Sequence, residues 1–174
     1  TFESEFNGVL YSYIIMPLFP QDLTEYIYNN ADPDPPTREQ VYSIMMQICG
    51  GVGAVHATNH AHADLKPENV LINDTDPANL KVSICDFGSA FDLDMGGPYD
   101  PYGHTLALSS PELVCNCEEL IGTGVDIVPI ACIYVELCTE QPLFYEKEDE
   151  CVHMALFAQI NKDDVFPPQI VSNR

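Results

Sequence analysis

The sequence predicts a mainly α-helical globular domain that carries one small β-hairpin. Three stretches support this fold class. Apolar residues recur every three or four positions between residues 41 and 55, residues 127–135 are almost entirely apolar, and the short strand-like stretches 70–72 and 80–84 flank a turn-rich segment. The chain has 174 residues, of which 46% are hydrophobic and 19% charged, so it is long enough and apolar enough to form one hydrophobic core.

The composition is strongly acidic and excludes several classes of partner. The chain has 27 acidic side chains against 6 lysines and arginines, a formal net charge of −21. Without a basic patch to neutralise phosphates, we expect no nucleic-acid partner and no membrane partner. Residues 127–135 form the longest apolar stretch, which is far short of the roughly 18 residues of a membrane-spanning helix. Seven cysteines, an odd number lying mainly in apolar stretches, indicate an intracellular location, cytoplasmic or nuclear.

The first half of the chain predicts one strand and two helices. Residues 9–16 are rich in Tyr, Ile and Val and end at proline, which indicates a strand followed by an extended connector. A short helix is expected over residues 21–29. Thr37 and Gln40 form a capping-box pattern, so a long helix with one buried face should start there and end near His56.

The second half predicts the hairpin, a long loop and two further helices. Residues 73–77 are dense in turn formers and join the strands of the hairpin. Residues 89–109 carry glycines and prolines without apolar periodicity, which is typical of a functional surface segment. We expect a buried central helix over residues 126–138, capped by Asp126, with Pro129 tolerated in its first turn. An amphipathic helix is expected over residues 152–160.

The chemically informative residues lie in two predicted turns. Residues 62–69 read His-Ala-Asp-Leu-Lys-Pro-Glu-Asn, between the long helix and the hairpin, and Asp-Phe-Gly at residues 86–88 follows the hairpin directly. Phosphoryl transfer needs a carboxylate that orients a hydroxyl and accepts its proton, a cation near the moving phosphate, and oxygen ligands for Mg²⁺. The two turns contain all of these groups.

These motifs resemble those of a eukaryotic protein kinase of the Ser/Thr type. The catalytic-loop sequence, the Asp-Phe-Gly triplet and Ser110-Pro111-Glu112 at the Ala-Pro-Glu position occur in the family's order. Asp126 is similar to the family's aspartate that lies under the catalytic loop. Residues 17–23 look like the hinge of the CMGC group, and the two catalytic motifs are similar to those of the spliceosomal pre-mRNA-processing kinase.

The resemblance implies roles for individual residues. Asp64 would be the catalytic base, Lys66 would contact the γ-phosphate of ATP, and Asn69 and Asp86 would hold Mg²⁺. Thr105 would belong to the acceptor site of a Ser/Thr kinase. Each of these residues also has an alternative interpretation as an ordinary turn or surface residue.

Four further residues would contact the nucleotide. The resemblance makes Met16 the gatekeeper, places Leu18 in the adenine-facing hinge, lets Asp22 reach the ribose and puts Leu71 beneath the base. Met16 and Leu71 as ordinary core residues are an equal alternative, since an apolar side chain needs no ligand to explain it.

The resemblance also predicts the domain organisation. Residues 1–17 would be the last strand of the kinase small lobe and the start of the hinge, and residues 18–174 a large C-terminal lobe that is incomplete at its C-terminus. The rest of the small β-rich lobe is missing from this sequence, so we expect the chain alone to be inactive. The alternative to an ATP-dependent Ser/Thr kinase is a pseudokinase or kinase-like scaffold that acts by binding.

Several details refine this prediction. Ala63 replaces the arginine that precedes the catalytic aspartate in many kinases. We expect His62 to pack as a structural residue beside Phe87, and His56 and His60 to be plain helix-end residues. The partner would be a protein substrate, and the net charge of −21 favours basic peptides.

Overall fold

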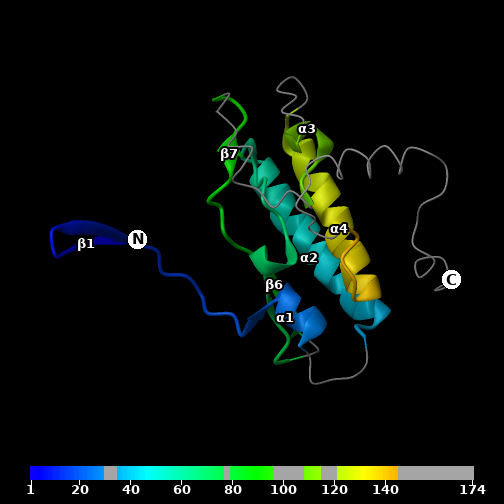
Figure 1. The fold of residues 1–174 in the computed structure, drawn as a ribbon. Coiled ribbons are helices and arrows are strands. Elements are labelled where there is room, and N and C mark those ends of the chain that lie inside the picture. Colours follow the sequence, from blue (N-terminus) through cyan, green and yellow to red (C-terminus); the bar gives the residue numbers. More distant parts are fainter. Residues whose placement is uncertain (30–34, 77–78, 96–107, 115–120, 145–174) are drawn as a thin grey trace.

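The computed structural model describes residues 1–29, 35–76, 79–95, 108–114 and 121–144 (Figure 1). The helix expected over residues 152–160, most of the expected loop 89–109 and Thr105 lie outside these ranges. Within the described residues, no helix is long and apolar enough to span a membrane.

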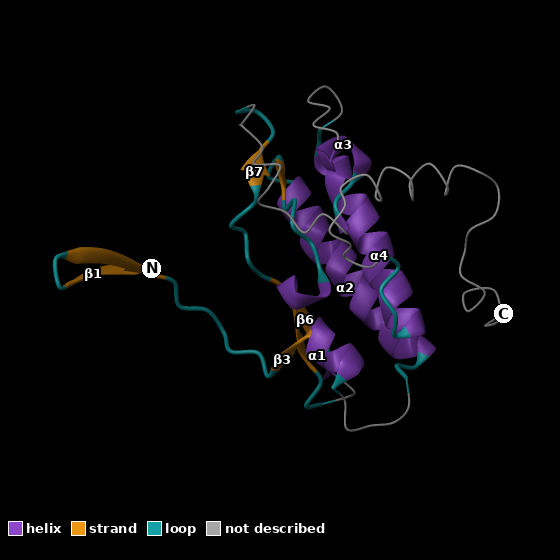
Figure 2. Ribbon diagram, viewed as in Figure 1, coloured by secondary structure: helices purple, strands orange, loops and turns teal. Residues whose placement is uncertain are grey.

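Helices form the main body of the described structure. They are α1 (Leu23–Tyr28), α2 (Arg38–His56), the one-turn α3 (Pro111–Val114) and α4 (Ile127–Thr139), with 3₁₀ turns at Pro67–Asn69 and Thr123–Asp126. The two long helices, α2 and α4, lie side by side, and α1 packs near one end of the pair (Figure 2). The expectation of a mainly α-helical body is confirmed for this part of the chain.

Three small antiparallel sheets accompany the helices, whereas the sequence predicts one hairpin and one further strand over residues 9–16. The strands are β1 (Phe2–Phe6), β2 (Val9–Tyr13), β3 (Gln21–Asp22), β4 (His60–Ala61), β5 (Val70–Asn73), β6 (Lys81–Ile84) and β7 (Phe91–Asp92). β1 pairs with β2, β4 pairs with β7, and the predicted hairpin β5–β6 gains β3 as a third strand in the order β3-β5-β6. Strands β3, β4 and β7 were hard to predict because they have only two residues each, and the five-residue β1 was also missed.

The long helix α2 follows its sequence pattern. The Thr37 hydroxyl caps it by accepting the backbone N–H of Gln40 at 3.3 Å, and Oε1 of Gln40 in turn accepts the backbone N–H of Thr37 at 2.8 Å. The predicted apolar face packs in the main core, which combines residues of α1, α2, α4 and the β5 strand. Its buried members are Leu23, Tyr26, Ile27, Ile44, Ile48, Val52, Leu65, Val70, Ile72, Ile133 and Leu137.

The N-terminal hairpin β1–β2 lies apart from this body on an extended connector (Figure 1). The expected strand over residues 9–16 ends at Tyr13, so the prediction was too long. Met16 and Leu18 lie on the connector with exposed fractions of 58% and 95%. The alternative interpretation of Met16 as a core residue is therefore wrong.

Other element predictions need smaller corrections. The first helix begins at Leu23, because residues 21 and 22 pair with β5 and Asp22 caps the helix by accepting the Glu25 N–H at 2.8 Å. α4 is not buried on all sides, since Ile127 and Tyr134 are exposed. The end of the expected surface segment 89–109 is also buried, as Leu108 and Ser109 show.

Candidate active site

The segment 62–69 is held at both ends by short strands. β4 ends at Ala61 and is paired with β7, while β5 begins at Val70, directly after the 3₁₀ turn of Pro67–Asn69. Pro67 starts this turn, where its missing N–H costs nothing. The intervening residues are fixed by polar contacts.

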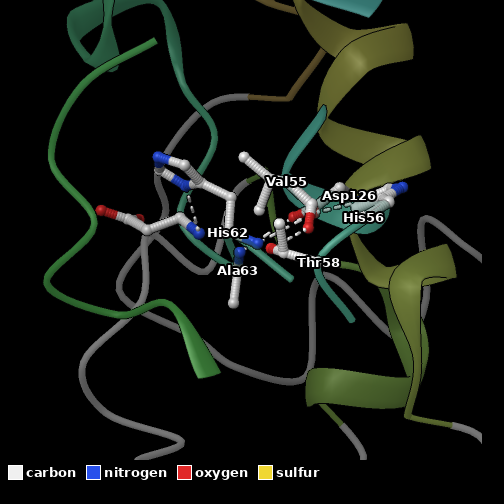
Figure 3. Close-up of polar contacts among 7 residues, drawn as sticks. Val55, His56, Thr58, His62, Ala63 and Asp126 are labelled. Carbon is white, nitrogen blue, oxygen red and sulfur yellow. Dashed lines mark hydrogen bonds and ion pairs between the residues drawn. The ribbon is translucent and has the colours of Figure 1, made fainter. Parts of the chain in front are cut away.

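The Asp126 carboxylate lies under this loop and binds its backbone (Figure 3). Asp126 is fully buried, and its two oxygens accept the N–H of His62 at 2.9 Å and of Ala63 at 2.8 Å. The predicted position under the loop is confirmed. The predicted capping of α4 by the Asp126 side chain is wrong, because the carboxylate is turned toward the loop instead.

His56 is a third partner of this carboxylate. Its Nε2 lies 2.8 Å from Oδ2 of Asp126, and an ionised carboxylate only accepts hydrogen bonds, so Nε2 is the donor. Our expectation of plain helix-end residues was therefore wrong for His56, and it was also wrong for His60, which lies in strand β4. The contact spans 70 positions of sequence, which no local pattern could reveal.

His62 joins the loop to the segment that carries Asp86. Its Nε2 lies 3.0 Å from the carbonyl of Cys85, which only accepts, and its Nδ1 lies 3.3 Å from the N–H of Asp64, which only donates. These two partners require a neutral ring protonated at Nε2. The ring also packs on Phe87 at a centroid distance of 5.0 Å, so the predicted structural role is confirmed.

Three predicted site residues meet within the loop. Nζ of Lys66 lies 3.0 Å from Oδ2 of Asp64, and the amide of Asn69 donates to the same oxygen at 3.2 Å and to the Asp64 carbonyl at 2.8 Å. Asp64 and Lys66 are half-buried and Asn69 is buried. Since the Asn69 nitrogen makes these contacts, its oxygen is the atom suited to bind a cation.

Asp86 is brought beside this group by the β5–β6 ladder. Val70 pairs with Ile84, and the N–H of Cys85 then donates to the carbonyl of Asn69 at 2.9 Å. Asp86 follows directly, with an exposed side chain and a left-handed backbone at φ 58°. Its Oδ1 accepts the Gly88 N–H at 3.2 Å. The chain segments that carry Asn69 and Asp86 are thus neighbours.

Asp22 and Leu71 also lie near this position, opposite each other in the β3–β5 ladder. The pKa of the Cys85 thiol is raised, first by burial and then by the negative charges of Asp86 and Asp22. Both carboxylates are therefore close to Cys85, which directly follows strand β6. Leu71 is half-buried, so it is neither fully in the core nor fully exposed.

The remaining predicted residues are not gathered at the loop. Met16 and Leu18 lie on the exposed connector, and Thr105 lies outside the described residues. Among the described residues, no three His, Cys, Asp or Glu side chains gather as potential metal ligands. A divalent ion here would take only Asn69 and Asp86 from the protein, which suits Mg²⁺ that keeps water and phosphate oxygens in its coordination shell.

Comparison with known proteins decides the family. Residues 4–172 match the family model of the protein kinase domain. The chain belongs to the protein kinase family. The kinase-like fold and the resemblance to the CMGC group are thereby confirmed at the level of fold and group.

Two curated relatives illustrate the similarity of this kinase sequence. A mitogen-activated protein kinase homolog, NTF6, from Nicotiana tabacum is 35% identical over 140 residues, which cover 80% of this chain and 35% of the relative. A cell division control protein 2 homolog from Antirrhinum majus is 31% identical over 144 residues, covering 79% and 45%. The chain therefore spans less than half the length of these relatives.

A solved structure supports the same fold. The crystal structure of the yeast RNA polymerase II CTD kinase complex CTDK-1 contains a chain that superposes with a TM-score of 0.69 at 21% identity. The match covers 89% of this chain and 48% of the other. At this identity the likeness shows the kinase fold alone.

Proposed function

We propose that this chain belongs to a catalytic domain that transfers the γ-phosphoryl group of ATP to Ser or Thr of protein substrates. The observation that carries the proposal is the Asp64 carboxylate, which Lys66 and Asn69 contact at 3.0 and 3.2 Å. We further propose that residues 1–17, which contain the strands β1 and β2 and not the single strand expected, form the end of a small lobe with the start of the hinge, and that residues 18–174 belong to the large lobe.

Asp64 acts as the general base in this proposal. Its carboxylate is fixed from two sides, so it can orient the substrate hydroxyl and accept its proton while the oxygen attacks phosphorus. The ammonium group of Lys66, already beside Asp64, offsets the negative charge on the transferred phosphoryl group. Asn69 also donates to the backbone carbonyl of Asp64, which ties the proposed base to the turn of Pro67–Asn69.

Asn69 and Asp86 would hold the magnesium ions. Oxygen atoms are the ligands that Mg²⁺ prefers, and Asn69 and Asp86, which lie on neighbouring segments, would supply an amide oxygen and a carboxylate. When bound, Mg²⁺ neutralises charge on the ATP phosphates. Gly88 supports the arrangement, because its N–H holds one Asp86 oxygen, and a Cβ at Gly88 would lie only 3.1 Å from that oxygen.

The nucleotide would lie along β3, β5 and the connector. Asp22 and Leu71 face each other at this edge, and we assign them to the ribose and the base. Met16 and Leu18 would contribute the gatekeeper and hinge contacts, which suits their exposure on the connector. Thr105 would contribute to the acceptor site of the Ser/Thr substrate.

The substrate would be a protein with basic residues near the acceptor. A formal net charge of −21 attracts cationic peptides, although salt screens the field within about 8 Å. Phosphorylation of a peptide array should therefore favour Lys and Arg flanks. A preference for acidic flanks would contradict this part of the proposal. We place the protein in the cytoplasm or nucleus because of its odd, scattered cysteines.

The decisive experiment replaces the base in the full-length protein that contains this chain. Asp64→Asn should lower the rate of peptide phosphorylation roughly 10²–10⁴-fold, about 3–5 kcal/mol, with the thermal unfolding midpoint nearly unchanged. Asp94→Asn is the matched control, because it makes the same chemical change at an exposed site and should leave the rate unchanged. Rates are measured with radiolabelled ATP at saturating Mg²⁺.

Two results would contradict the proposal. A full-length protein whose transfer rate is the same with Asp64 and with Asn at this position does not use this base. A full-length protein that binds protein partners but shows no transfer above background would favour the alternative, a pseudokinase or kinase-like scaffold.

A further inference from the structure

The strand that leads to Asp86 is held on its outer edge by a single side chain. β6 lies at the end of the described sheet β3-β5-β6, with β5 on one side. On the other side, Oε1 of Gln47 accepts the N–H of Val82 at 2.9 Å, and Nε2 donates to the carbonyl of Leu80 at 3.1 Å. One side-chain amide thus satisfies a donor and an acceptor of the strand backbone.

This contact resembles the pairing offered by a neighbouring strand. Leu80 and Val82 are two positions apart, so their outward backbone groups lie on one edge, and an amide presents a matching acceptor and donor. Nε2 of Gln47 also reaches the carbonyl and hydroxyl of Ser43 at 3.3 and 3.4 Å. Oxygen acceptors surround the nitrogen while an N–H faces the oxygen, which fixes the orientation of the amide.

A second contact lies one helical turn further along the same face of α2. A Cβ added at Gly51 would lie 2.9 Å from Cδ1 of Ile84, so the Ile84 side chain packs closely against the helix where the glycine leaves room. Gln47 and Gly51 therefore seat β6 at residues 80, 82 and 84. The next two residues are Cys85, bonded to Asn69, and Asp86.

We propose that Gln47 is a positioning residue for Asp86, acting through the outer edge of β6. The proposal rests on the function proposed above, in which Asp86 and Asn69 share the magnesium ions. Asn69 ends the turn before β5 and Asp86 follows β6, so the separation of the two ligands depends on how β6 lies on β5. Gln47 supplies backbone bonds from the opposite side and limits sliding or twisting of the strand.

The test compares Gln47→Met with Ser43→Ala in the full-length protein. Met keeps the size of Gln but neither hydrogen bond, whereas Ser43→Ala removes the hydroxyl contact of Nε2 and leaves the Ser43 carbonyl contact and both bonds from Gln47 to Leu80 and Val82. For Gln47→Met we expect about tenfold faster hydrogen exchange at the Val82 amide and about a tenfold higher Mg²⁺ concentration for half-maximal phosphorylation. The KM for the peptide should not change. Ser43→Ala should behave like the wild type.

A second variant keeps the proposal testable if Gln47→Met unfolds. Gln47→Glu retains the acceptor for Val82 but loses the donor for Leu80, so the Val82 amide should stay protected while the Mg²⁺ requirement rises to an intermediate value. An unchanged Mg²⁺ response in active, folded variants would overturn this proposal alone. A wild-type protein without any magnesium-dependent transfer would overturn the proposed function, and with it the role of Asp86, whereas exchange at Val82 would still report the Gln47 contact.

Discussion

Removing the Asp126 carboxylate should destabilise the protein strongly, and the structure gives the magnitude. In Asp126→Ala the backbone N–H groups of His62 and Ala63 lose their acceptors in a region where both residues are buried. Each unsatisfied buried donor costs about 1–3 kcal/mol, so the free energy of unfolding should fall by about 2–6 kcal/mol. A typical domain has only about 5–15 kcal/mol in total, so this loss is large.

Asp126→Asn keeps the size of the side chain while it removes the charge and one of the two acceptor oxygens. The amide keeps one oxygen, so one backbone N–H retains its acceptor while the other meets an NH₂ group. We expect about half the loss, roughly 1–3 kcal/mol. Urea unfolding of the full-length protein at neutral pH measures both variants, and exposed Asp94→Asn again serves as the control. A loss below about 1 kcal/mol for Asp126→Ala would refute the reasoning.

Two further predictions concern buried positions. Ala63→Val should lower the free energy of unfolding by about 2–4 kcal/mol in urea titrations, because a β-branched residue at φ 64° is strained and the site is full. The control Ala54→Val, on the exposed side of α2, should lower the free energy of unfolding by only about 0.5 kcal/mol. Equal losses for Ala63→Val and Ala54→Val would contradict this prediction. Burial raises the pKa of Glu136, against the lowering effect of its Tyr28 hydrogen bond. Above pH 4.5, the ordinary pKa of a glutamate, the native state therefore binds more protons than the unfolded state. The free energy of unfolding of the wild type should then fall as the pH rises from 4.5 through the raised native pKa. Glu136→Gln should abolish this decline and should be more stable than the wild type at pH 7.5. Urea midpoints of the two proteins that differ by the same amount at pH 4 and at pH 7.5 would contradict this prediction.

Local patterns predicted those parts of the fold that local interactions determine. The capping box of Thr37 and Gln40 and the apolar spacing of α2 involve residues within one or two turns of each other, so they can be read from the sequence. The β5–β6 hairpin was predictable for the same reason, because turn formers lie between its strands. The candidate residues Asp64, Lys66 and Asn69 lie within six positions, so their meeting required only the turn that Pro67 starts.

Contacts between distant segments were not predictable in this way. Asp126 precedes a helix, and capping was the natural local interpretation, yet its carboxylate forms stronger links to amides more than 60 positions earlier. Once those amides are buried, an acceptor is worth more to them than to the exposed end of a helix. The same reasoning applies to His56, whose partner is set by the packing of α2 against α4.

Helix α2 connects the two halves of the candidate site. At its C-terminal end, His56 contacts the carboxylate that holds the backbone leading to Asp64. Two and a half turns earlier, Gln47 holds the strand that leads to Asp86. Neither residue touches a predicted reacting group, but each constrains one of the two carboxylates. Because an α-helix is stiff over this length, the chain segments that lead to Asp64 and to Asp86 are kept at a fixed separation. We therefore expect the separation of Asp64 and Asp86, the proposed base and metal ligand, to depend on a helix whose own sequence carries no catalytic motif.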